Sequence, residues 1–158
     1  MTEMVWHYTR MDFLDEILNC GELRPTADRL DHSNLHRGRQ RYAGQPLLWF
    51  SANQQWEYLS EQLISLHDKS ITWQQLASAH GAIRFGLPAT APRLLNWKET
   101  IAVGFNRQER RSREKVAKKA ARNRSDANKW FTTTVPIPLT QLRFQTWVEG
   151  DWIDYKWA

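Results

Sequence analysis

The chain is poor in cysteine and has no long apolar run. Cys20 is the single cysteine among 158 residues, so an intrachain disulfide and a thiolate metal cluster are both excluded. Nowhere do about eighteen apolar residues follow one another, and residues 1–4 lack the basic start and apolar run of a secretory leader. The sequence therefore predicts a soluble, cytoplasmic protein.

Several nucleotide-binding and catalytic signatures are also missing. The chain contains no G-x-G-x-x-G after a strand, no G-x-x-x-x-G-K-[ST], no H-E-x-x-H and no G-x-S-x-G. These absences exclude a Rossmann dinucleotide site, a P-loop, a zincin protease and an α/β-hydrolase elbow. His32 and His36 are four residues apart in a polar region, but no third ligand follows at a recognisable spacing. We therefore expect no metal site.

Tryptophan and positive charge are plentiful instead. The chain has nine Trp, four Tyr and six Phe, side chains that fill a core and also stack on flat ligands. Its formal net charge is +5 and its sequence pI is near 9.6, which favours an acidic partner. Basic residues gather in Arg107–Arg124, where alanines favour a helix. This segment predicts either a solvated helix face or a surface that binds nucleic acid or an acidic protein.

The N-terminal stretch Val5 to Gly21 has a strand followed at once by a helix. Aromatic and β-branched residues favour a strand over Val5–Thr9, and Thr9 with Asp12 three residues later is typical of a helix start. Apolar residues at helical spacing follow, and Gly21 supplies a left-handed stop. The polar groups at the junction would form a ligand cradle. The alternative is that the aromatic residues are core and His7 is a hydrogen-bonded strand residue.

The remaining pattern predicts a single α+β domain over residues 1–158, with a mixed, split β-sheet flanked by helices. Residues 94–105 are ambiguous, although Thr100–Val103 leans toward a strand. Glu149-Gly150-Asp151 is a credible tight turn between two paired strands. We expect strands at 47–51, 82–87, 130–137, 142–149 and 151–157, and helices from Trp56, from Thr72 to near Gly81, and over the basic segment.

This order resembles the ADP-ribosyltransferase fold, in which a split sheet grips NAD without a Rossmann motif. The resemblance depends on three pieces: Val5 to Gly21 with its His-Tyr-Thr, Leu47 to Ser51 with Trp56-Glu57 beyond, and the C-terminal hairpin. It implies that NAD is the substrate. The Arg107–Arg124 segment would then hold a macromolecular acceptor.

The resemblance also implies a role for each matching residue. In such enzymes a first-strand His contacts the nicotinamide-side ribose, a second-strand Ser or Thr supports the site, an aromatic ring stacks on nicotinamide, and a late Glu stabilises the transition state. By position these roles fall to His7, Ser51, one of Tyr8, Trp49 or Trp56, and Glu149, with Thr9 beside them. Because Glu149 lies in a predicted turn, Gln145 and Glu99 are alternatives for the place of the acid.

Two classes of function therefore remain. The first is an NAD-dependent mono-ADP-ribosyltransferase that modifies nucleic acid or an acidic protein. The second is a non-catalytic module that holds nucleic acid, or inhibits a protein partner, through the basic segment and a Trp-rich surface.

Overall fold

A computed structural model describes residues 3–25, 46–57, 73–103, 107–122 and 125–155 of the chain. Its strands are β1 (Met4–Arg10), β2 (Glu22–Leu23), β3 (Leu48–Ser51), β4 (Ala82–Pro88), β5 (Leu95–Asn96), β6 (Trp130–Thr133), β7 (Ile137–Pro138), β8 (Arg143–Val148) and β9 (Asp151–Asp154). Its α-helices are α1 (Leu14–Cys20), α4 (Trp73–His80), α5 (Trp97–Ala102) and α6 (Arg107–Ala121), with 3-10 turns η1 (Met11–Phe13), η3 (Ala127–Lys129) and η4 (Leu139–Gln141).

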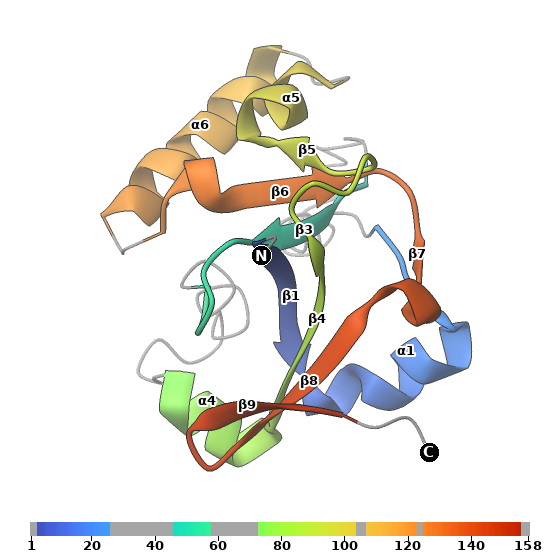
Figure 1. Cartoon of the computed structure of the whole chain (residues 1–158). Helices are drawn as coiled ribbons and strands as arrows, with labels where there is room; N and C mark the ends of the chain where they lie inside the picture. The colour runs from blue at the N-terminus through green and yellow to red at the C-terminus, as the bar shows by residue number, and fades with distance from the viewer. Residues whose placement is uncertain (1–2, 26–45, 58–72, 104–106, 123–124, 156–158) are drawn as a thin grey trace, which may run out of the picture.

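Seven strands form one sheet in the order β5-β6-β3-β1-β4-β8-β9, and β2 pairs with β7 separately. The predicted α+β class is confirmed, and so is the expectation that strands from both ends of the chain share a sheet. The prediction of a mixed sheet is wrong for the described strands, because every pairing among them is antiparallel. Strand β1 lies at the centre, with β3 on one side and β4 on the other (Figure 1).

The two faces of the sheet differ in chemistry because side chains alternate along each strand. One face, here called the apolar face, carries the largest core cluster, which includes Val5, Phe50, Ile83, Phe85 and Phe144. The other, here called the aromatic face, carries a second cluster built on Trp6, Tyr8, Trp56, Ala77 and Ala82. Neighbouring residues of β1 therefore belong to different environments.

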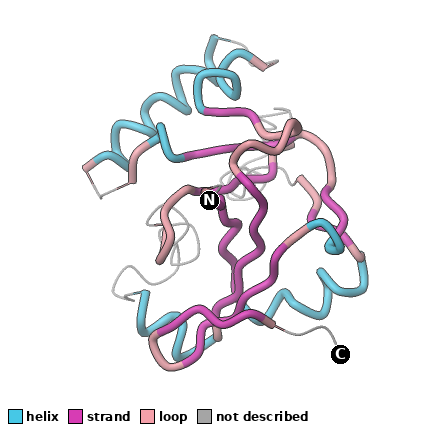
Figure 2. Tube along the Cα trace, in the orientation of Figure 1, coloured by secondary structure: helices cyan, strands magenta, loops and turns pink. Residues whose placement is uncertain are grey.

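The described helices pack on both faces, and they lie toward the two ends of the sheet (Figure 2). On the apolar face Leu14 and Ile17 of α1 pack against the main core. On the aromatic face α4 contributes Ala77 to the second cluster. At the β6 end, Thr100 of α5 forms a 2.7 Å hydrogen bond with Thr132, and both side chains are fully buried.

Most expected elements are confirmed, with three corrections. The expected strand over 130–137 is divided, because β6 ends at Thr133 and β7 begins at Ile137 and pairs with β2 outside the main sheet. Gly21 closes α1 with a φ of 70°, as its position predicts. Thr9, however, does not cap a helix, because β1 continues to Arg10 and the first turn has no side-chain cap. The predicted lean toward a strand at Thr100–Val103 is wrong. A capping box between Asn96 and Glu99 starts α5 there instead.

Some expectations lie outside the described residues. They are the His32/His36 pair, the start of a helix at Thr72 and most of the helix expected from Trp56. The helix that ends near Gly81 is confirmed as α4, and the basic helix is confirmed as α6. The C-terminal hairpin is confirmed too. Its turn places Glu149 and Gly150 at φ values of 49° and 88°.

A substitution at Gly86 of β4 would test how tightly the aromatic face is packed. An added Cβ would approach two ring atoms of Trp6 to 2.5 Å. The ring cannot step aside easily, because its Nε1 donates to Gln54 and the Arg84 guanidinium stacks on it. We expect Gly86→Ala to lower the free energy of unfolding by at least about 2 kcal/mol, within the range for overpacking.

Gly21→Ala is the matched control, measured in the same urea denaturation series. Its Cβ would meet nothing within 4 Å, so only the left-handed φ opposes the change. We expect a loss of about 1 kcal/mol there. A loss at Gly86 no larger than at Gly21 would contradict the tight packing of Trp6.

Candidate functional site

His7 and Thr9 lie on the apolar face of the central strand, and both are half-buried. The ring of His7 meets Phe50 of β3 edge to face, with centroids 6.0 Å apart. Its Nδ1 lies 2.8 Å from the backbone oxygen of Trp49. Because a carbonyl only accepts, Nδ1 carries a proton in this contact.

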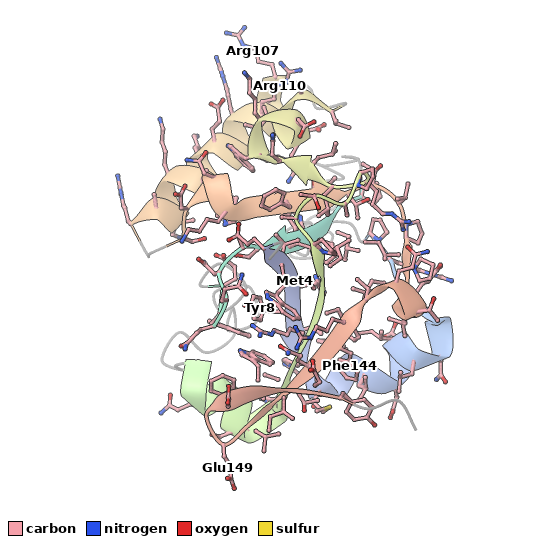
Figure 3. All side chains as sticks on the ribbon, viewed as in Figure 1. Met4, Tyr8, Arg107, Arg110, Phe144 and Glu149 are labelled. Carbon is pink, nitrogen blue, oxygen red and sulfur yellow. The ribbon has the colours of Figure 1, made fainter. Side chains whose placement is uncertain are left out.

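Tyr8 points to the opposite, aromatic face and is buried (Figure 3). Its hydroxyl donates to the backbone oxygen of Asn53 and accepts from Arg84 Nη1 at 3.3 Å. Trp56 meets its ring edge to face at a centroid distance of 5.0 Å. The structure therefore brings Tyr8 and Trp56 together, but it places them across the sheet from His7 and Thr9.

Arg84 of β4 is the charged centre of the aromatic face. It is 6% exposed, and its guanidinium lies 3.8 Å from the ring centre of Trp6 and 4.5 Å from that of Trp152. Its Nε donates to Gln145 at 2.8 Å, and its Nη1 donates to the backbone oxygen of Gln54 and to Tyr8. Stacking and donated hydrogen bonds together compensate the burial of this cation.

Residues 52–57, here called the crossing segment, run over the aromatic face. Three successive carbonyls of this segment accept from side chains of three different strands. The donors are Tyr8 of β1 to Asn53, Arg84 of β4 to Gln54, and Trp152 of β9 to Gln55 at 2.9 Å. The crossing segment is thus attached to the sheet by side-chain donors in place of a strand ladder.

Glu57 ends the crossing segment as a buried carboxylate, 4% exposed. It accepts from Ser51 at 2.5 Å, from the side-chain amide of Asn53 at 2.9 Å, and from Ser125. Trp130 of β6 donates in turn to Ser125 at 2.9 Å. Ser51 is therefore part of a network that joins β3, the crossing segment and the residues after α6.

Trp49 of β3 belongs to a third group of aromatic side chains, together with Trp97 and Trp130. Its ring centre lies 6.3 Å from that of Trp97 and 6.2 Å from that of Trp130. The Arg113 guanidinium of α6 lies 5.6 Å above the same ring. Trp49 therefore packs against α6, on the same sheet face as Tyr8 but one strand further toward β5.

The candidate acids lie apart from His7. Phe144 is level with His7 across β4, and Glu149 follows five residues later, so their Cα atoms are separated by on the order of 20 Å. Glu149 occupies the exposed turn between β8 and β9 and points away from the sheet (Figure 3). Gln145 is buried beside Arg84, and Glu99 caps α5.

The electrostatics follow this arrangement. Burial raises the pKa of Tyr8 to about 12, although the neighbouring Arg84 acts in the opposite direction. Burial also lowers the pKa of Arg84 below its usual value. The hydrogen bond from Arg143 lowers the pKa of Asp154 to about 2, and Gln145 adds to this effect. At neutral pH Tyr8 is therefore a neutral phenol that can donate to the Asn53 carbonyl.

The described ranges contain no group of three or more His, Cys, Asp or Glu side chains arranged to hold a metal ion. No described helix is long and apolar enough to cross a membrane.

Sequence reasoning missed the two buried ionic groups, Arg84 and Glu57. A signal for Arg84 was present, since it is a lone charged residue inside the otherwise apolar stretch Ala82–Leu87. A buried charge there needs stacking or hydrogen-bond partners. The partners of Glu57 come from residues as distant as Ser125, and no local pattern indicates that contact.

Glu57→Gln tests the buried carboxylate network. The amide keeps the shape of the carboxylate but offers one oxygen where two accept, and it directs its NH2 at other donors. We expect the free energy of unfolding to fall by about 2–3 kcal/mol, as for unsatisfied buried polar groups. Urea denaturation measures this loss. Glu114→Gln on the exposed side of α6 should change stability by less than about 0.5 kcal/mol, and equal effects would contradict the network.

No family model matches the chain, and neither a curated protein nor a solved structure matches it.

Proposed function

We propose that the chain binds NAD at the His7 and Thr9 side of its central strand and transfers ADP-ribose to a macromolecule. The observation that carries this proposal is the fixed orientation of His7. Strand pairing holds its backbone between β3 and β4, and the Trp49 carbonyl holds its Nδ1 at 2.8 Å. A half-buried imidazole with a fixed orientation is suited to a polar contact with a ribose hydroxyl.

Thr9 supports the same assignment, because it follows His7 by two residues and therefore lies on the same face of β1. Its hydroxyl is both donor and acceptor, so it complements the ribose hydroxyls or the nicotinamide amide. Tyr8, Trp56 and Ser51 act differently in this proposal. They hold the crossing segment and Glu57 behind the strand, and so keep β1 and β3 in place.

The transfer step needs a carboxylate near the sugar. The bond between C1′ of the ribose and the nicotinamide nitrogen breaks, nicotinamide leaves with the electron pair, and an acceptor group bonds to C1′ and loses a proton. Positive charge develops on the ribose during this step, and a nearby carboxylate stabilises it. Glu149 is the acid that we propose, and its exposed turn must approach His7 in the NAD complex for it to act.

The separation of Glu149 from His7 favours a second candidate, a binding module without transferase activity. In that case His7 and Thr9 are structural strand residues, and function resides in the basic and Trp-rich end of the molecule around α6. The transferase should be stabilised by NAD and should release nicotinamide from it. The binding module should do neither.

Thermal unfolding with and without saturating NAD tests the proposal. NAD should raise the melting temperature, because a ligand that binds only the native state stabilises it by mass action. At about 100 times its Kd the gain is about 2.7 kcal/mol. His7→Ala should remove this gain and leave the unliganded protein folded. His80→Ala is the matched control, since His80 is a second half-buried histidine that interacts with Asp12.

Release of free nicotinamide, measured by chromatography, tests the catalytic half separately. Glu149→Gln should keep the NAD-dependent shift and lose nicotinamide release, since the carboxylate acts on charge present only in the transition state. Full activity in Glu149→Gln would reassign the acid, with Glu99 next. No thermal shift and no nicotinamide release in the native protein would favour the binding module.

A further inference from the structure

Helix α6 has two sides of opposite character. Glu109, Arg113, Val116, Ala117 and Ala120 are buried or half-buried and form the inner side. Arg113 stacks over Trp49, and Ala120 is 2% exposed. The last turn is anchored as well, because its Ala120 carbonyl accepts from the backbone N–H of Ser125 at 3.0 Å, next to the Glu57 network. The helix is thus held firmly by its inner side.

The outer side of α6 carries a row of exposed cations. Their spacing of three or four residues places them on one side of the helix, and Arg122 continues the row just beyond it. We call this set the basic stripe; its members are Arg107, Arg111, Lys115, Lys118 and Arg122. Arg110 and Lys119 flank it. Arg107 and Arg110 are seen to point away from the sheet (Figure 3).

The charge of the chain is concentrated here. Residues 107–122 contain eight basic and two acidic side chains, an excess of six, whereas the whole chain has a net charge of +5. The remaining residues are therefore close to neutral, with a net charge of −1. A single helix accounts for the entire positive balance, which argues against a diffuse charge that serves solubility alone.

The shape of the basic stripe favours a phosphate backbone over an acidic protein. An α-helix rises about 1.5 Å per residue, so the stripe from Arg107 to Arg122 is about 22 Å long, and its cations are roughly 5–6 Å apart along the helix axis. Protein interfaces usually have a buried apolar or aromatic centre. The stripe has none, because its members are all Lys or Arg, and Val116, Ala117 and Ala120 lie on the inner side of α6.

We infer that the basic stripe of α6 binds the phosphate backbone of nucleic acid without reading its sequence. Lys and Arg neutralise the phosphates and release condensed counterions, so binding depends steeply on salt. Every member of the stripe is Lys or Arg, and these charges neutralise phosphate oxygens in any sequence, so contacts to the backbone suffice for binding. This inference is independent of NAD and of transferase activity.

Fluorescence anisotropy with a labelled oligonucleotide tests the inference in the absence of NAD. The probes are one sequence as single-stranded DNA, as duplex DNA and as RNA, together with a scrambled sequence. Five phosphate contacts should weaken duplex binding about 500-fold between roughly 50 and 200 mM salt, and single-strand binding about 100-fold. The scrambled sequence should bind equally well. Comparison of the three probes shows which nucleic acid the stripe prefers.

The decisive variant is Lys115→Glu/Lys118→Glu, which reverses two members of the basic stripe and keeps good helix formers in place. It should weaken binding at least about tenfold. The slope of log affinity against log salt concentration should become shallower by the amount expected for the loss of about two phosphate contacts. Its matched control is Arg24→Glu/Arg93→Glu, which changes the net charge equally at exposed positions outside α6. The control should bind as the native chain does.

Three results would overturn the inference. They are unchanged affinity in the stripe variant, an equal loss in the control variant, and displacement of the oligonucleotide by poly-glutamate at equal charge concentration. The last result would assign the basic stripe to acidic proteins. Because no NAD is present, none of these results bears on the NAD proposal, and failure of the NAD proposal leaves the binding test unaffected.

Discussion

The stacked cation Arg84 is the contact on which the aromatic face depends. A buried guanidinium is costly unless its charge and its donors are compensated. Here the guanidinium lies over the rings of Trp6 and Trp152, and Gln145, Gln54 and Tyr8 accept from its nitrogens. These partners come from β1, β8, β9 and the crossing segment, so one side chain of β4 joins four strands of the sheet and a segment without regular structure.

This arrangement explains why several candidate ligand-binding residues have structural partners. Tyr8, Ser51 and Trp56 are buried, and each interacts with another part of the aromatic face. His7 and Thr9 lie on the other face, where alternation along β1 separates them from Tyr8. The candidate site is therefore divided by the sheet, and the proposed NAD site is confined to the His7 side.

Local patterns predicted the parts of the fold that depend on local physics. Aromatic and β-branched runs gave β1, β3, β4 and the C-terminal hairpin, and Gly21 gave the end of α1. Thr100–Val103 has strand propensity, yet the capping box of Asn96 and Glu99 and the burial of Thr100 favour a helix. The Glu57 network and the Arg84 stack unite residues distant in sequence, which periodicity cannot indicate. The position of Glu149 relative to His7 depends on the order of strands in the sheet, which the sequence patterns do not predict.

The crossing segment also constrains the order in which the chain becomes structured. Its Gln55 carbonyl accepts from Trp152, 97 residues later, and Gln145 completes the donors of Arg84. During synthesis Trp6 and Arg84 emerge long before these partners, so the aromatic face stays incompletely covered until β8 and β9 are made. Folding of this face is therefore a late and strongly non-local event, governed by the C-terminal hairpin rather than by the strands that are synthesised first.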